Sequence, residues 1–194
     1  MTAAATVLGW QLGPAGAAEV TDTMVLPAAA TLPFDGETPI RVAPEVVFLL
    51  REDLAGPGVT AAAVCAAASV AAGLAVTAAD GATVTGLRLA AHALPCDFDL
   101  SLVGALLELG GDVVATAAGA AVAGHPAEAV ARFANDRAAA GEEPLRRGQL
   151  VASGLLLDPR PMTAPGEAAA VFGRLGTVAV TVAVSDADMA VTAR

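Results

Sequence analysis

The sequence predicts a strand-rich fold with few helices, of the barrel or rolled-sheet kind. Short apolar runs rich in branched residues recur along the chain, and turn signals built from Gly, Pro and Asp separate them. Few segments carry both a helix start and a helix stop signal. Hydrophobic residues make up 56% of the chain and charged residues 15%, a balance that excludes a disordered protein. At 194 residues the chain fits one domain with a sizeable core.

In the first half of the chain, the expected strands are short apolar runs that end at turn residues. They cover residues 6–12, 23–26, 41–50, 74–77 and 83–89. The run over 41–50 (RVAPEVVFLL) is the most convincing. Pro44 inside it indicates an edge or a bulge, because proline cannot donate a backbone hydrogen bond. Asp80–Gly81 is a two-residue turn signal between the last two runs.

The second half of the chain is more regular. An apolar run over 100–109, a Gly-Gly pair and a second apolar run over 112–117 predict a β-hairpin. Further strands are expected over 150–157 and 178–184. Many short strands with few helices between them favour a sheet that curls on itself.

Helix signals mark two segments clearly. Thr60 is a candidate N-cap for a helix over Ala61–Ala72, which Gly73 ends. Pro126 lies near the first turn of a helix expected over Ala127–Ala140, and a glycine follows directly. We expect both helices to flank the sheet.

The charge of the chain excludes several partners and chemistries. The net charge is −10 and the isoelectric point is near 4.4, which argues against nucleic acid and anionic membrane as partners. All ten basic residues are Arg, so no lysine is present. Schiff-base chemistry, an amine base and a phosphate-binding loop lysine are therefore excluded.

Targeting and cysteine signals are weak. The first residues lack the positive region and apolar core of a signal peptide, and the Ala-rich run over 61–79 is too weakly hydrophobic to span a membrane. Cys65 and Cys96 have neither metal-type nor redox-type spacing, and Cys65 is interpreted as a small buried hydrophobic residue. We expect a cytoplasmic protein.

Several motifs resemble one family. They are TDTMVLPAAATLP, APEVVFLLREDLAGPGVTAAAV, GAAVAGHPAEAVARFAN, LRRGQLVASG and PGEAAAVFGRLGTVAV. Together they resemble the 2-keto-4-pentenoate hydratases, a branch of the fumarylacetoacetate hydrolase superfamily. The resemblance implies an α+β fold, a twisted mixed β-roll or barrel-like sheet with flanking helices. It implies a single hydratase-like domain over residues 1–194, without the N-terminal helical segment of longer members, and a helix cap at His125.

The resemblance also implies an active site that this chain lacks. Family members bind a divalent cation through a Glu-x-Glu pair on one strand and a third Glu on the next, and such cations need clustered oxygen ligands. The corresponding positions here are Ala43, Glu45 and Ala75. The family's active-site lysine corresponds to Gln11 in Gly9–Gly13. We therefore expect no metal ion and no other cofactor, and an apolar pocket in place of the metal site.

Six residues are candidates for this emptied site. We interpret Glu45 and Gln11 as catalytic, and a further set as substrate-binding, namely Trp10, Ala43, Ala75 and Ser153. Glu45 is either a general acid or base with a raised pKa, or a relict carboxylate held by hydrogen bonds. Gln11 either donates a hydrogen bond to a substrate carbonyl or packs at a sheet edge. Trp10 either forms a wall of the pocket or belongs to the core.

Three functions are compatible with these residues. The first is a metal-independent cyclase or isomerase that promotes ring closure or rearrangement of an apolar, polyketide-like small molecule in specialised metabolism. The second is a non-catalytic hydratase-like subunit or scaffold partner. The third is a 2-oxo acid hydratase in which Asp80, Glu37 or Asp97 replaces the missing ligands. A homodimer is expected in each case.

Overall fold

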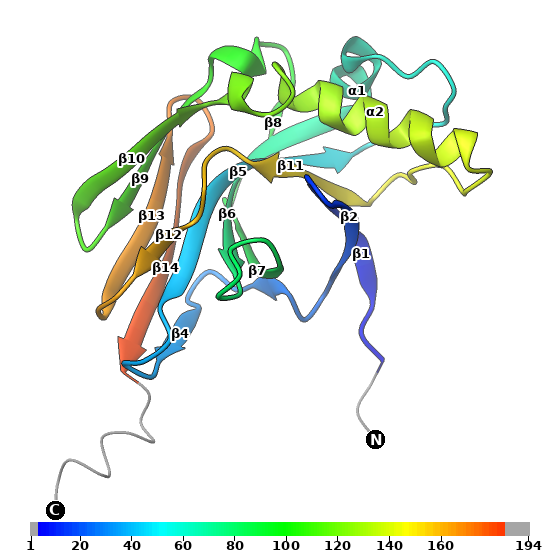
Figure 1. The fold of residues 1–194 in the computed structure, drawn as a ribbon. Helices are drawn as coiled ribbons and strands as arrows, with labels where there is room; N and C mark the ends of the chain where they lie inside the picture. Colours follow the sequence, from blue (N-terminus) through cyan, green and yellow to red (C-terminus); the bar gives the residue numbers. More distant parts are fainter. Residues whose placement is uncertain (1–3, 185–194) are drawn as a thin grey trace, which may run out of the picture.

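The computed structural model describes residues 4–184, which form two curved sheets with helices at one end (Figure 1). The larger sheet has nine strands in the order β2-β1-β11-β5-β6-β7-β3, with β12 paired to β5 and β8 paired to β6. Its strands are β1 (Val7–Gly13), β2 (Gly16–Thr21), β3 (Val25–Leu26), β5 (Ile40–Leu50), β6 (Ala68–Thr77), β7 (Val84–Leu89), β8 (Leu94–Pro95), β11 (Leu150–Leu155) and β12 (Arg160–Met162). The pairing is mixed, since β1 and β11 are parallel and β5 and β6 are antiparallel.

The smaller sheet has five strands in the order β10-β9-β13-β14-β4. These strands are β4 (Thr31–Phe34), β9 (Gly104–Leu109), β10 (Asp112–Ala118), β13 (Gly166–Phe172) and β14 (Gly176–Val184). The described α-helices are α1 (Ala61–Ala67) and α2 (Pro126–Ala139), and short 3-10 turns lie at Leu100–Leu102 and Gly119–Ala121. Figure 1 shows α1 and α2 together at one end of the larger sheet. The predicted barrel-like mixed sheet with flanking helices is confirmed.

Hydrophobic clusters cover both faces of the larger sheet. The main core takes Val42, Val46 and Phe48 from β5, together with residues of the smaller sheet and of both helices. A second cluster, which includes Val47 of β5, lies on the other face. It consists of Val20, Val47, Leu87, Leu150 and Ala152. Because strand side chains alternate between faces, Glu45 lies on the same face as Val47.

Both predicted helix starts are confirmed. The Thr60 hydroxyl accepts a hydrogen bond from the Ala63 amide at 3.2 Å, and His125 Nδ1 accepts one from the Ala127 amide at 3.1 Å. The end of the first helix was predicted wrongly, since α1 stops at Ala67 and the chain continues directly as β6. Alanine favours a helix locally, but the residues after Ala67 pair with β5 on one side and with β8 or β7 on the other, and nearly all are buried. This tertiary packing decides their conformation.

The interpretation of Cys65 as a small buried hydrophobic residue is wrong, because it is only partly buried and is joined to another cysteine. Cys65 of α1 forms a disulfide with Cys96, and their Cα atoms are 4.9 Å apart. None of the described helices is long and apolar enough to cross a membrane.

Candidate functional site

Glu45 lies in the middle of the larger sheet and is fully buried. In the strand register it stands opposite Gly73 of β6 on one side and Leu155 of β11 on the other. Gln11 of β1 reaches it across the curved sheet, and its Nε2 donates to Glu45 Oε2 at 2.8 Å. The same Nε2 donates to the Leu12 carbonyl at 3.2 Å, so both amide hydrogens are used. The structure therefore brings together the two residues that were predicted to be catalytic.

Each of these two side chains keeps one polar atom free. Glu45 Oε1 and Gln11 Oε1 are buried and have no hydrogen-bond partner in the structure. Burial raises the pKa of Glu45 from 4.5 to about 7, and the hydrogen bond from Gln11 lowers it in part. Glu45 can therefore gain or lose a proton near neutral pH.

A missing side chain makes room for Glu45. A Cβ atom added to Gly73 would come within 2.8 Å of Val47 Cγ2 and 3.1 Å of Glu45 Cγ. Beside this pair, Ala43 and Ala75 stand directly opposite each other in β5 and β6. The Glu45 side chain therefore occupies space that a side chain at position 73 would fill.

Ser153 lies on the strand next to Glu45. The register of β11 against β5 shifts between Ala152, which pairs with Val47, and Leu155, which pairs with Glu45. Ser153 falls inside this irregular stretch, is 2% exposed and has no partner for its hydroxyl oxygen. It thus adds a third buried polar atom without a partner in the neighbourhood of Glu45.

Trp10 does not form a wall of this site. Its ring contacts Phe133 of α2 edge-on, with ring centroids 5.4 Å apart, and the Arg137 guanidinium lies 4.6 Å from its centroid. Adjacent residues of a strand point to opposite faces, so Trp10 faces α2 while Gln11 faces Glu45. The alternative reading of Trp10 as a core residue fits this position.

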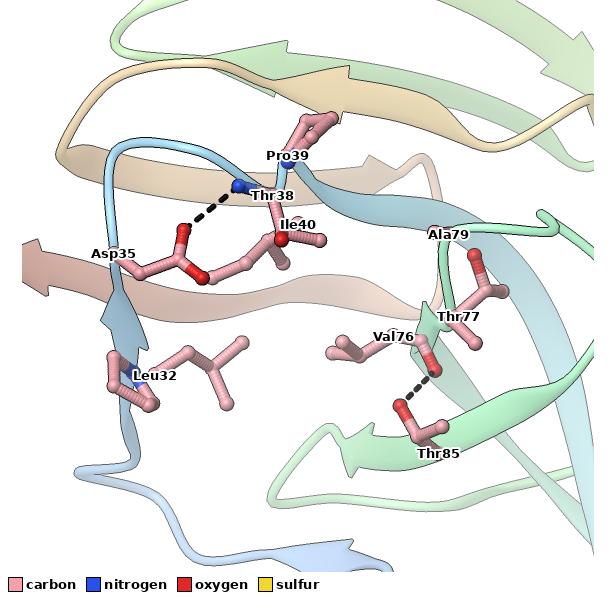
Figure 2. Close-up of a pocket in the computed structure, with 11 residues that line it drawn as sticks. Leu32, Asp35, Thr38, Pro39, Ile40, Val76, Thr77, Ala79 and Thr85 are labelled. Atoms are coloured by element: carbon pink, nitrogen blue, oxygen red, sulfur yellow. Dashed lines mark hydrogen bonds between the residues drawn. The ribbon is translucent and has the colours of Figure 1, made fainter.

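Ala43 and Ala75, which were expected to line an apolar pocket, lie inside the sheet and do not border the cavity described here. Both alanines are fully buried, since the directly paired strands β5 and β6 pack tightly at small residues. A cavity of about 280 Å³ lies instead at the end of β6 (Figure 2). It is lined by Leu32, Pro33, Asp35, Thr38, Pro39, Ile40, Val76, Thr77, Ala78, Ala79 and Thr85, and includes none of the six candidate residues.

The residues of the site do not fit a divalent cation. Within the described residues, no group of three or more His, Cys, Asp or Glu side chains could hold a metal ion. Glu45 is the only carboxylate at the three family positions, and an amide N–H already occupies its Oε2. Asp80 lies in the turn after β6, where its carboxylate accepts hydrogen bonds from the Ala82 and Thr83 amides and the Thr83 hydroxyl.

Comparisons with known proteins agree with this architecture, although no family model matches the chain. The chain is 31% identical over 172 residues to 2-hydroxyhexa-2,4-dienoate hydratase of Comamonas testosteroni. This alignment covers 79% of the chain and 64% of the hydratase. It is 40% identical over 84 residues to 4-oxalocrotonate decarboxylase of Pseudomonas sp. (strain CF600). This second alignment covers 43% of the chain and 30% of the decarboxylase.

The solved structure of 4-oxalocrotonate decarboxylase from Pseudomonas putida G7, complexed with magnesium and adipate, has the same fold. It superposes with a TM-score of 0.79 at 23% identity and covers 92% of this chain and 79% of that chain. The curved mixed sheet thus defines a hydratase-like fold. In sequence and fold the chain is similar to these proteins, which agrees with the resemblance of its motifs to the hydratase branch of the fumarylacetoacetate hydrolase superfamily. It spans just under two thirds of the hydratase's length and under a third of the decarboxylase's.

Proposed function

We propose that this protein is an enzyme that transfers protons on the hydratase scaffold without a bound metal ion. Glu45 serves as the general acid and base, and Gln11 is the residue that positions it. The substrate is a small apolar molecule of polyketide type with an enolisable carbonyl group. The reaction is an isomerisation or a ring closure.

The unpaired atoms beside Glu45 carry this proposal. A buried polar atom without a partner costs about 1–3 kcal/mol, a cost that a bound molecule removes by hydrogen bonding. Glu45 Oε1 and Gln11 Oε1 both lack partners, and Ser153 Oγ lacks one on the adjacent strand. A purely structural carboxylate would be expected to have both oxygens satisfied.

The protonation behaviour of Glu45 suits proton transfer. Its pKa of about 7 means that ionised and neutral forms are both present near neutral pH. As a base, Glu45 takes a proton from the carbon next to the substrate carbonyl. As an acid, the same group returns this proton at the other end of the conjugated system, or to the carbonyl oxygen when a ring closes. Gln11 holds Glu45 Oε2, which leaves Oε1 to face the reacting atom.

The closed state of the site favours a second candidate, a non-catalytic hydratase-like subunit. Glu45 is fully buried, Gln11 is 6% exposed, and the cavity in Figure 2 reaches neither. In this reading, Gln11 neutralises a remnant of the metal site and the pocket has no role. Catalysis, in contrast, requires that the face of the larger sheet that carries Glu45 opens to admit the substrate.

Hydrogen exchange of a model substrate separates the two candidates. Phenylacetone is apolar and enolisable, and deuterium entry next to its carbonyl can be followed by NMR in D₂O with a chelator present. We expect the wild type to accelerate exchange and Glu45→Gln to lower the rate by roughly 10²–10⁴-fold, the usual contribution of a general base. Glu167→Gln, an exposed position on β13, is the matched control and keeps the wild-type rate.

Two results would favour the subunit instead. Either the wild type gives only the buffer rate, or Glu45→Gln exchanges as fast as the wild type. Ala75→Glu adds a further test, because it buries a carboxylate beside Glu45. That charge should abolish turnover by an enzyme, but it should leave a partner's activity nearly untouched if the chain is only a subunit.

A further inference from the structure

The two cysteines of the chain lie in segments that the proposed reaction does not use. They are separated by 31 residues in sequence and are joined in the structure, with Cα atoms 4.9 Å apart. This separation falls within the range found for disulfides. Neither residue belongs to the site around Glu45 or lines the cavity in Figure 2.

The disulfide joins the two ends of a segment of consecutive strands, β6, β7 and β8. Cys65 is in α1, which runs directly into β6, and Cys96 follows β8 at once. β8 pairs with the start of β6 through Ser69↔Pro95 and Val70↔Leu94. The disulfide therefore lies beside this pairing and fastens both ends of the segment β6–β7–β8.

The elements it fastens are short. α1 has seven residues and β8 has two, and elements of this length are marginal without further support. Both cysteines pack against the main core but remain partly exposed. A covalent link at this place supplies support that backbone pairing alone does not.

We propose that Cys65 and Cys96 form a reversible thiol–disulfide couple that clamps α1 and β8 to the start of β6. On oxidation, one cysteine thiolate attacks a low-molecular-weight disulfide such as oxidised glutathione and releases one thiol. The second cysteine then attacks the mixed disulfide and releases a second thiol. The protein loses two protons and two electrons, and the small disulfide is reduced to two thiols.

Thiol labelling tests the bond itself. The full chain is equilibrated with oxidised or reduced glutathione, quenched with acid, unfolded and treated with iodoacetamide. We expect no label on the intact monomer after oxidation and two labels after reduction, as measured by mass spectrometry. Two labels in both samples, or a covalent dimer on a non-reducing gel, would overturn the proposal.

Thermal unfolding tests the clamp. The disulfide joins residues that are 31 positions apart and so restricts the unfolded chain. We therefore expect that its reduction lowers the wild-type Tm by roughly 5–15 °C. The Cys65→Ser and Cys96→Ser variants should unfold near the Tm of the reduced wild type and should not respond to dithiothreitol. An equal Tm for the oxidised and reduced wild type would overturn the clamp, and this comparison does not depend on whether either variant folds.

Discussion

Glu45 is the residue whose surroundings decide what this protein can do. The family motif that the chain resembles implies two further glutamates beside it, but here Ala43 and Ala75 stand at both positions. Without a cation, a buried carboxylate is destabilised in its charged form and its pKa rises. The Gln11 amide stabilises the ionised form through one hydrogen bond, which is not enough to offset burial.

This shift predicts a specific pH dependence of stability. The pKa of Glu45 is about 7 in the folded protein and 4.5 when unfolded, so the folded state binds more protons between these values. The free energy of unfolding should therefore fall as pH rises from 4.5 to 7, by about 3 kcal/mol from this residue alone. The measurement is urea unfolding of the wild type and Glu45→Gln across this range.

The difference between the two proteins isolates the effect. Asp35, Asp53, Asp80 and Asp99 have lowered pKa values because backbone and side-chain hydrogen bonds favour their ionised forms, so they titrate below this range and are present in both proteins. A difference that stays constant between pH 4.5 and 7 would contradict the account of Glu45.

At the scale of single residues, the sequence predicted which residues meet at the site better than it predicted where their side chains point. Glu45 and Gln11 are 34 positions apart, and their contact could be expected only because both occupy active-site positions of a family motif. The orientation of Trp10 was not predictable, since a single short strand does not show which of its faces a distant helix covers. Ala43 and Ala75 lie opposite each other in β5 and β6, a pairing that depends on the strand register.

The paired strands β5 and β6 are the element that holds the site. Ten residue pairs join them, and Gly73 lies opposite Glu45 within this ladder. Gly73→Ala should push the new methyl group against Val47 and Glu45 and destabilise the protein by about 1–3 kcal/mol. Gly104→Ala is the matched strand control, because its Cβ would meet nothing within 4 Å.

Chemical denaturation of both glycine variants checks this prediction. Gly104→Ala should change stability little or raise it slightly, since alanine restricts the unfolded chain more than glycine does. Equal stabilities for the two variants would show that Gly73 is not needed to accommodate Glu45.

Element boundaries were predictable where local signals decide them. The caps at Thr60 and His125 gave both helix starts, because the capping hydrogen bond is made within three residues. The helix end at Ala67 was not predictable, since nothing local separates the helical alanines from those of β6. β4 was not among the predicted strands, because it becomes a strand only by pairing with β14, far along the chain.

At the scale of the molecule, the missing ligands should make Mg²⁺ irrelevant to stability. We expect the wild-type Tm to be unchanged in Mg²⁺. An Ala43→Glu/Ala75→Glu double variant, which restores the three family carboxylates, should gain roughly 5–10 °C at a hundredfold excess over Kd. Scanning fluorimetry measures both. A clear rise in the wild-type Tm that Glu45→Ala abolishes would contradict the donor-set argument.

The smaller sheet offers a surface for self-association. Its edge strand β10 has exposed Val113 and Val114, and Leu106 is exposed on the neighbouring β9. Charged side chains usually protect an edge strand from pairing with another chain, whereas Val113 and Val114 are uncharged. We therefore expect a homodimer with two-fold symmetry, about twice 18.9 kDa by light scattering.

A charge on this edge tests where the copies meet. Val114→Lys should shift the equilibrium towards the monomer, whereas Val7→Lys, at an exposed position on β1, should not. A monomeric wild type at micromolar concentration would reject the dimer altogether.

The central claim is that Glu45 exchanges a proton near neutral pH without the help of a metal ion. An NMR titration of the protein labelled with ¹³C at the glutamate side-chain carboxyl, with chelator present, tests it most directly. The account predicts one carboxyl resonance with a pKa of about 7 that is absent from Glu45→Gln. If every glutamate resonance instead titrates near 4.5, Glu45 is an ordinary carboxylate and the claim is contradicted.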